Sequence, residues 1–291
     1  WCLGGDLRSG VRRGRRPAPS AESGEKTTRR SGGRKGEKLV LRAADSGDGK
    51  PCAELGDFGA DLFFRDRAAP GADSINITGD ITQGLGAIRD VEIDYDGSRL
   101  LFSMRTPFIE GVDEEDQPAT WNIWQYTFAT GELVRVIADD LTAEIGHDIM
   151  PKYLPDGRII FSSTRQTQSQ ALLLDENKGA FPAMDEDQNE FAFNLHVMED
   201  DGSGLRQVTF NQSHDLDPAV LDDGRVVFSR WDGARPNDGV DLYVMNPDGT
   251  NQRRLTEDAA NDFHPIWSPD GAQIAFVSDR DGNNEIYVMD A

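Results

Sequence analysis

Histidine and aspartate recur at one place in this sequence, just before the proline of several related segments. The residues are His147, Asp148, His214, Asp215, Asp262 and His264. Imidazole and carboxylate groups that converge from neighbouring segments can bind a metal ion or another ligand. Aspartate at such positions more often caps a link by accepting backbone amides. We therefore regard capping as the commoner role and carry the six residues as candidate binding residues.

Two acidic stretches are a second source of ligand atoms. Residues 106–120 include Asp113 and Asp116, and residues 166–190 include Asp185 and Asp187. Carboxylate oxygens of this kind can hold Ca²⁺, although acidic loops are more commonly only solvated. We carry these four aspartates as a candidate calcium site. No other cofactor is predicted for this chain.

Motifs for other chemistry are missing from the sequence. Gly-x-Ser-x-Gly, the mark of a serine hydrolase, does not occur, and neither does a glycine-rich phosphate loop. Cys2 and Cys52 are the only cysteines, which excludes a cysteine zinc site within the chain and leaves a single bridge between them open. We therefore predict no catalytic machinery in these 291 residues.

The elements that would position these side chains form a repeat. Four short apolar segments run into an Asp-Gly pair, whose glycines are Gly97, Gly157, Gly224 and Gly271. An alternating apolar run follows each pair, and the four runs end at Phe102, Phe161, Phe228 and Phe276. Asp-Gly between alternating runs is a strong hairpin signal, and a second hairpin completes most units. Four antiparallel strands per unit make a propeller blade.

The predicted fold is an all-β propeller of four-stranded antiparallel blades in an incomplete ring. Residues 1–55 are predicted to be a disordered basic tail, because they lack apolar periodicity, and 56–291 to be the propeller. The expected blades are a partial one at 61–80, then 88–137, 148–209 and 215–256, with a truncated one at 262–291. Since propellers protect their edges by closing, we expect the natural protein to continue beyond Ala291.

The strand order of a blade predicts two different faces. The Asp-Gly turns lie on one face, whereas the acidic inserts and the links with histidine and aspartate lie on the other. The second face is therefore expected to be strongly negative. Such a face should attract a basic partner or a divalent cation, with association that weakens as salt rises.

Two resemblances support this interpretation. Residues 264–271, 274–280 and 285–290 resemble the WD-like repeat of TolB-type propellers. Residues 113–118, 154–166 and 211–218 resemble the propeller-bearing middle domain of hydrazine synthase alpha-subunit-like proteins. Covalent haem in that family would require Cys-x-x-Cys-His, which this sequence lacks. The second resemblance therefore implies a domain of a periplasmic assembly without its haem chemistry.

Charge and hydropathy limit the partners. Residues 1–42 hold 12 Lys and Arg against four Asp and Glu, a local formal charge of +8. Since the whole chain carries −22, the remaining residues carry −30. So acidic a body repels phosphate backbones, and we predict no nucleic-acid partner. No transmembrane segment is predicted, because no apolar run reaches about 18 residues. No secretion signal is recognisable, and a periplasmic or other extracytoplasmic location is implied only by the resemblances.

Two functions follow from these observations. The first is a non-catalytic propeller that binds a protein partner or a ligand, as a scaffold in an extracytoplasmic complex. The alternative is the propeller domain of a larger periplasmic multi-haem redox enzyme whose catalytic part is absent from this chain.

Overall fold

The computed structural model describes residues 42–43, 60–65, 73–109, 111–113, 116–185, 188, 190–221, 223–232 and 239–291. The chain divides into two units, which are treated separately below. Unit 1 comprises Trp1–Ile88 and Thr106–Gln117, and unit 2 comprises Arg89–Arg105 and Pro118–Ala291. Apart from 42–43, the predicted tail 1–55 lies outside the described residues, as do both cysteines.

Unit 1 contains a small antiparallel sheet. Its strands lie in the order β1 (Arg42–Ala43), β2 (Leu62–Phe64) and β3 (Ile75–Asn76), followed by the short helix α1 (Gly79–Thr82). Two of these strands belong to the predicted partial blade. β1 falls inside the range expected to be a tail, where Arg42 and Ala43 pair with Phe63 and Leu62.

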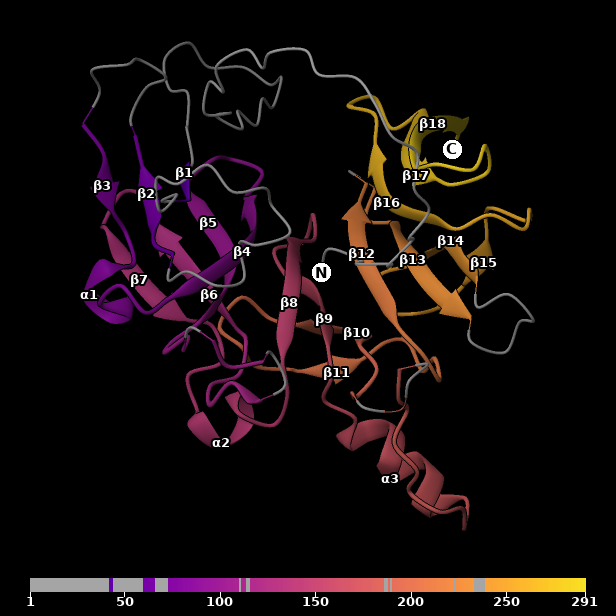
Figure 1. Cartoon of the computed structure of the whole chain (residues 1–291), viewed down its shortest axis with the longest axis horizontal. Helices are drawn as coiled ribbons and strands as arrows, with labels where there is room; N and C mark the ends of the chain where they lie inside the picture. Colours follow the sequence, from indigo (N-terminus) through magenta and orange to yellow (C-terminus); the bar gives the residue numbers. More distant parts are fainter. Residues whose placement is uncertain are drawn as a thin grey trace, which may run out of the picture. The chain divides into compact units, whose positions relative to one another are not determined.

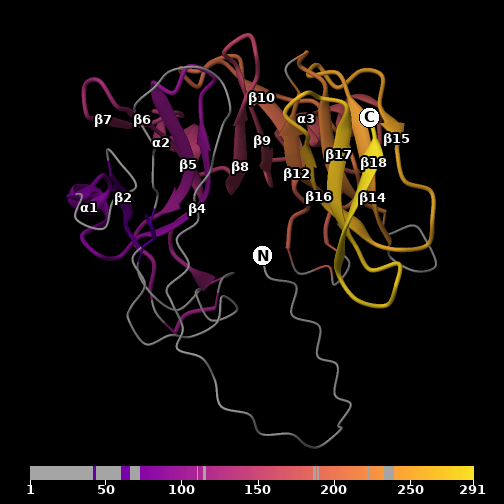
Figure 2. The same cartoon turned by 90° about the horizontal axis from the view of Figure 1, so that it is seen from above.

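Unit 2 is built from antiparallel sheets whose strands follow one another in chain order (Figures 1 and 2). Blade 1 contains β4 (Ala87–Ile93), whose first two residues are assigned to unit 1, with β5 (Arg99–Arg105), β6 (Asn122–Thr127) and β7 (Glu132–Arg135). Blade 2 contains β8 (Asp148–Tyr153), β9 (Ile159–Ser163), β10 (Asn194–Met198) and β11 (Arg206–Gln207). Blade 3 contains β12 (Asp215–Val220), β13 (Val226–Asp232), β14 (Gly239–Met245) and β15 (Arg253–Arg254). Blade 4 contains β16 (Asp262–Trp267), β17 (Gln273–Ser278) and β18 (Glu285–Asp290). The predicted fold class, an incomplete propeller, is confirmed.

The Asp-Gly hairpins form as predicted, with the same turn in all four blades. The glycines have φ of 77°, 93°, 89° and 67°. Each glycine amide donates to the carbonyl three residues earlier, as Gly157 does to Leu154 at 3.0 Å. An L-residue rarely adopts this left-handed conformation, which explains glycine at the second position of every pair.

The core lies between consecutive blades and is centred on the predicted phenylalanines. Phe102, Phe161 and Phe228 are fully buried, and Phe276 is 4% exposed. Phe161 of blade 2 packs in one cluster with Leu101 of blade 1, and Phe228 of blade 3 packs with residues of blade 2. Phe276 joins residues of blade 3 in the same way. Blades 2, 3 and 4 thus each cover one face of the blade before them, and the prediction that the rings pack between blades is confirmed for Phe161, Phe228 and Phe276.

The connection between β9 and β10 differs from the expected acidic loop. It begins with a helix, α3 (Thr167–Asp175), and a shorter helix, α2 (Asp140–Ala143), lies in the link before β8. None of the residues of α3 is buried. No helix in the described ranges combines the length and apolarity needed to cross a membrane.

Candidate functional site

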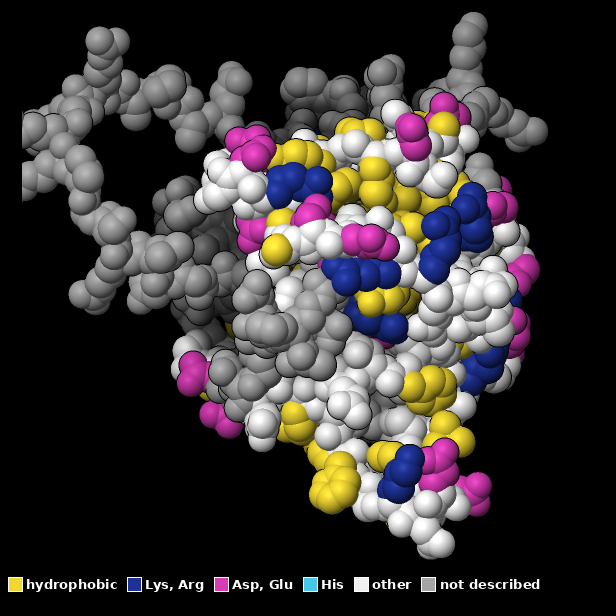
Figure 3. Space-filling model, turned by 90° about the vertical axis from the view of Figure 1, so that its right-hand side faces the viewer, with side chains coloured by type: hydrophobic (Ala, Val, Ile, Leu, Met, Phe, Trp, Pro, Cys, Tyr) yellow, Lys and Arg dark blue, Asp and Glu magenta, His cyan; other side chains and the backbone are white. Residues whose placement is uncertain are grey.

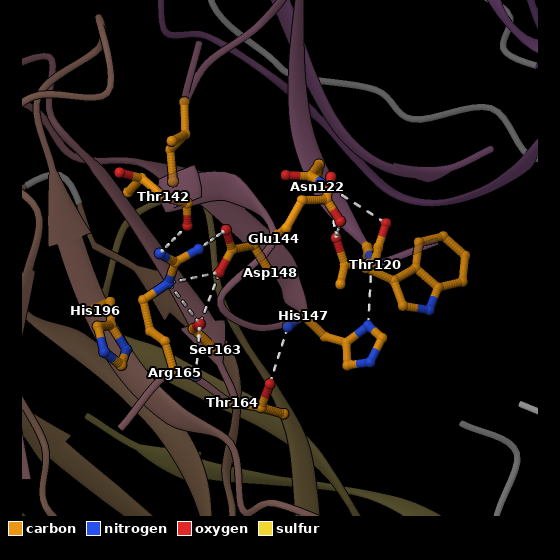
Figure 4. Close-up of polar contacts among 12 residues, drawn as sticks. Thr120, Asn122, Thr142, Glu144, His147, Asp148, Ser163, Thr164, Arg165 and His196 are labelled. Carbon is orange, nitrogen blue, oxygen red and sulfur yellow. Dashed lines mark hydrogen bonds and ion pairs between the residues drawn. The ribbon is translucent and has the colours of Figure 1, made fainter. Parts of the chain in front are cut away.

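The three link aspartates are buried at the starts of the first strands, where each forms an ion pair with arginine. Asp148, Asp215 and Asp262 are all 0% exposed. In blade 2, Asp148 accepts hydrogen bonds from the Ser163 hydroxyl at 2.7 Å and from Arg165 Nε at 3.1 Å (Figure 4). The strand register makes this contact possible, because Asp148 lies opposite Ser163.

Blades 3 and 4 repeat the ion pair with small changes. Arg230 lies directly opposite Asp215, and its Nε and Nη2 donate to the carboxylate at 2.7 and 2.9 Å. Arg280 Nη2 donates to Asp262 at 2.9 Å. A fully buried carboxylate needs such a partner, because desolvation strongly disfavours the charged form. Burial raises the pKa of Asp148 to about 6, against the opposing influence of Arg165 and Ser163.

The residue before each aspartate, and not the aspartate, accepts a backbone amide. Nδ1 of His147 accepts from the Trp121 amide at 3.1 Å, and Nδ1 of His214 accepts from the Phe193 amide at 3.2 Å. In the next link Asn261 replaces histidine, and its Oδ1 accepts from the Val240 amide at 3.1 Å. The capping alternative therefore named the right link but the wrong acceptor.

The hydrogen bonds accepted by His147, His214 and Asn261 join blades 2, 3 and 4 to the third strand, or the residue just before it, of the preceding blade. Trp121 precedes β6 of blade 1, and its carbonyl also accepts the amide of Asp148 at 2.8 Å. Because Nδ1 accepts a hydrogen bond in His147 and in His214, that nitrogen carries no proton in either ring. Burial lowers the pKa of His214, which fits this neutral form. The histidines at 147 and 214 thus hold neighbouring blades together.

His264 occupies a different position and belongs to a row of residues with left-handed backbone. Asp90, Met150, Asp217 and His264 have φ between 53° and 58°, and the last three precede proline. In β8, β12 and β16 the strand register shifts at this residue, which is the mark of a β-bulge. Strained residues that repeat at one position indicate a geometry that the surrounding contacts enforce.

The row links the first strands of consecutive blades. Asp90 accepts from the Met150 amide at 3.0 Å, and Met150 Sδ accepts from the Asp217 amide at 3.2 Å. Asp217 Oδ1 lies 3.0 Å from Nδ1 of His264, which is half exposed. Its hydrogen bond to Asp217 raises the pKa of His264. The sequence analysis did not identify Asp90, Met150 and Asp217. The available signal was their shared position in the repeat, directly before Pro151 and Pro218 and, for Asp90, before Val91.

The predicted binding residues are therefore divided. His147, Asp148, His214 and Asp215 make contacts within and between blades, Asp262 pairs with Arg280, and only His264 is exposed. Within the described part of the chain, no three His, Cys, Asp or Glu side chains are grouped so that they could hold a metal ion. A ligand role for the set stays a prediction.

The candidate calcium residues are also distributed. Asp113 and Asp116 belong to unit 1 and Asp185 to unit 2, while Asp187 lies outside the described residues. Asp185 Oδ1 accepts from the Glu190 amide at 3.2 Å, so part of its capacity serves the local turn. The calcium site stays a prediction.

Several exposed apolar side chains lie on the segments that lead to one end of blade 2. Register places the start of β8, the end of β9 and the start of β10 together, because Ser163 pairs with both Asp148 and Asn194. We call this the link end of blade 2. The segments that enter or leave it carry Leu141, Ile145, Leu172, Leu174, Phe181, Phe191 and Phe210. These are seven of the sixteen exposed large hydrophobic side chains of the described residues, which makes this end a candidate interaction surface.

Comparison with known proteins agrees with this architecture. Residues 232–291 match the family model of the TolB beta propeller domain, PD40. A search of the curated proteins found no match. Hydrazine synthase of Kuenenia stuttgartiensis superposes with a TM-score of 0.57 and 18% identity, over 84% of this chain and 36% of that one. TolB of Acinetobacter baumannii gives 0.53 and 13%, over 87% and 49%.

An enzyme is among the similar structures. Oligogalacturonate lyase of Vibrio parahaemolyticus superposes with a TM-score of 0.54 and 16% identity, over 86% of this chain and 58% of that one. The chain thus spans between about a third and somewhat more than half of these proteins. At these identities the likeness shows the fold alone, a TolB-like propeller that TolB shares with enzymes.

Proposed function

We propose that this chain is a non-catalytic protein-interaction propeller of an extracytoplasmic bacterial protein, and that the link end of blade 2 is where a partner docks. The exposed apolar cluster there carries the proposal. Leu141 is 84% exposed and Ile145 is 53% exposed, although the blade they adjoin buries its own apolar residues completely. Apolar surface left in water at one end of a well-packed sheet favours association with another protein.

The charged residues beside Leu141 indicate which charge the partner's surface should carry. Asp140 and Glu144 flank Leu141, with side chains 85% and 51% exposed. Arg135 pairs with both, but its own side chain is only 19% exposed. The surface beside Leu141 therefore presents two exposed carboxylates, and a partner with basic residues at its rim would associate faster and more specifically there.

The test compares partner recovery by three forms of the tagged protein from its native host. The link-end variant carries Leu141→Ser, Ile145→Ser and Phe210→Ser, and the control carries Tyr95→Ser and Val134→Ser, exposed apolar residues elsewhere in unit 2. We expect wild type and control to recover a stoichiometric partner, and the link-end variant to bind that purified partner at least tenfold more weakly. Equal binding by all three forms would contradict the proposal.

A second candidate function is a propeller domain in a larger periplasmic redox enzyme. It is favoured by the superposition on hydrazine synthase, which extends over most of this chain. The full-length polypeptide isolated from its host distinguishes the two. Covalently bound haem in that polypeptide would support the redox enzyme, and its absence together with a stoichiometric protein partner would support the interaction module.

A further inference from the structure

The helix-bearing insert of blade 2 forms an arm with a fixed base. We define the arm as residues 166–185. Gln166, 6% exposed, holds it closed: Oε1 accepts from the Ala183 amide at 2.8 Å, and Nε2 donates to the carbonyls of Ala183 and Ala192 at 2.7 and 3.3 Å. Gln168 Oε1 accepts from the Gln207 amide at 3.0 Å, which ties the start of α3 to β11. The base of the arm is thus part of the blade.

The tip of the arm has the opposite character. Leu172, Leu174 and Phe181 are 49%, 61% and 77% exposed. Hydrophobic side chains project from the α3 segment at the bottom of Figure 3, beyond the body of the molecule. A helix of nine residues is marginal in water and ordinarily depends on an apolar face that packs against something. The described part of this chain covers the helix only in part: Leu173 is half-buried, and none of the residues of α3 is fully buried.

Charge identifies the class of surface that would cover the tip. Asp175 and Glu176 end the helix, and the nearby Lys178 is already paired with Glu176 at 2.6 Å. Helices that bind membranes carry Lys and Arg on their polar face, and anionic headgroups would repel this one. A second copy is disfavoured as the occupant by like-charge repulsion, since the whole chain carries a net charge of −22. A protein groove with a basic rim satisfies both the apolar and the acidic parts.

We propose that the arm inserts the apolar side chains of its tip into a groove of a second protein whose rim carries Lys or Arg. This inference rests on the proposed interaction function and specifies that the tip of the arm is the part of the chain that holds the partner. Leucines at 172, 173 and 174 point in different directions around one helix, so a groove that encloses the helix covers more of them than a flat surface would.

The experiment first fixes the contact and then measures it. A photo-crosslinking phenylalanine analogue replaces Leu174, and at a control position Val134 on β7, in cells of the native host. We expect a protein adduct from position 174 only, with the crosslinked partner peptide in an apolar surface bordered by Lys or Arg. The purified partner is then titrated calorimetrically with the full chain.

Two double variants separate the arm from the rest of the link end. Leu174→Ser with Phe181→Ser should weaken binding at least tenfold without lowering the unfolding temperature, because both side chains are exposed. If Leu141→Ser with Ile145→Ser weakens binding and the arm variant does not, the arm inference is overturned while the interaction function stands. If neither changes the affinity, the arm inference and the placement of the docking site at the link end of blade 2 are both overturned. Crosslinking to lipid, or binding of phosphatidylserine vesicles that the arm variant loses, would also overturn the arm inference.

Discussion

The residue opposite the core phenylalanine is a histidine in blade 2 and a tyrosine in blades 3 and 4. His196 faces Phe161 where Tyr243 faces Phe228 and Tyr287 faces Phe276. The ring pairs have nearly the same geometry, with centroids 5.8, 6.0 and 6.1 Å apart and interplanar angles of 32° to 33°. Burial lowers the pKa of His196 to about 4. Blade 2 therefore carries an acid-sensitive group where blades 3 and 4 carry tyrosine and blade 1 carries Trp124.

This difference predicts an acid-dependent stability. A histidine whose pKa is lower in the folded state stabilises the fold above its unfolded pKa of about 6.5 and loses that contribution as pH falls toward 4. We expect His196→Tyr to flatten the decline in unfolding free energy between pH 6.5 and 4, measured by denaturant titration. His264→Gln, the control, should leave that window unchanged, because the raised pKa of His264 acts above 6.5. An unchanged acid slope in His196→Tyr would refute the assignment.

At Gly249 the backbone of blade 3 approaches the backbone of blade 2 so closely that a side chain has no room. A Cβ at Gly249 would lie 2.2 Å from the Val208 carbonyl oxygen, whereas a Cβ at Gly97 would meet nothing within 4 Å. Both have positive φ, so alanine is strained by about 1 kcal/mol at either site. We expect Gly249→Ala to lower the unfolding free energy by about 2 kcal/mol more than Gly97→Ala. Equal losses in chemical denaturation would show that the backbone shifts freely there.

The element scale shows what could be predicted from sequence. The Asp-Gly turns and the phenylalanines are local signals repeated every blade, so the strand pattern and the core positions were correctly predicted. The contact between Asp148 and Arg165 depends on the register of β8 against β9, and a one-residue shift would remove it. Helix α3 lacks a side-chain cap and buries no residue, so neither capping nor periodicity marked it.

Blade 4 tests the rule that each blade covers the one before it. Ile286 pairs with Val277 at the position where Leu242 pairs with Ser229 in blade 3, yet Ile286 is 78% exposed and Leu242 is fully buried. We expect Leu242→Ala to cost about 2 to 5 kcal/mol and Ile286→Ala less than about 0.5 kcal/mol in this chain. The measurement is urea unfolding of both variants. A large cost at Ile286 would show that something in this chain covers that face.

At the scale of the whole molecule, unit 2 is a linear series in which each blade depends on its neighbours. Blades 2 and 3 contribute residues to core clusters shared with adjoining blades, whereas blade 4 contributes to one cluster and exposes Ile286 and Val288 on its other face. In such an array, stability is roughly the sum of unit and interface terms, so a terminal unit with one described interface opens first.

Hydrogen exchange of the 291-residue chain should therefore show a gradient along unit 2. We expect the amides of β10 and β14, the third strands of blades 2 and 3, to exchange more slowly than those of β18, the third strand of blade 4. One cause is the exposed outer face of blade 4. The other is strand pairing, because β14 is paired on both sides, with β13 and β15, whereas β18 pairs with β17 alone among the described strands. Mass spectrometry of peptides from the three strands gives the comparison directly. Equal protection in β18 and β14 would mean that unit 2 opens as one cooperative block, and the exposed face of blade 4 would then have no energetic consequence for the chain.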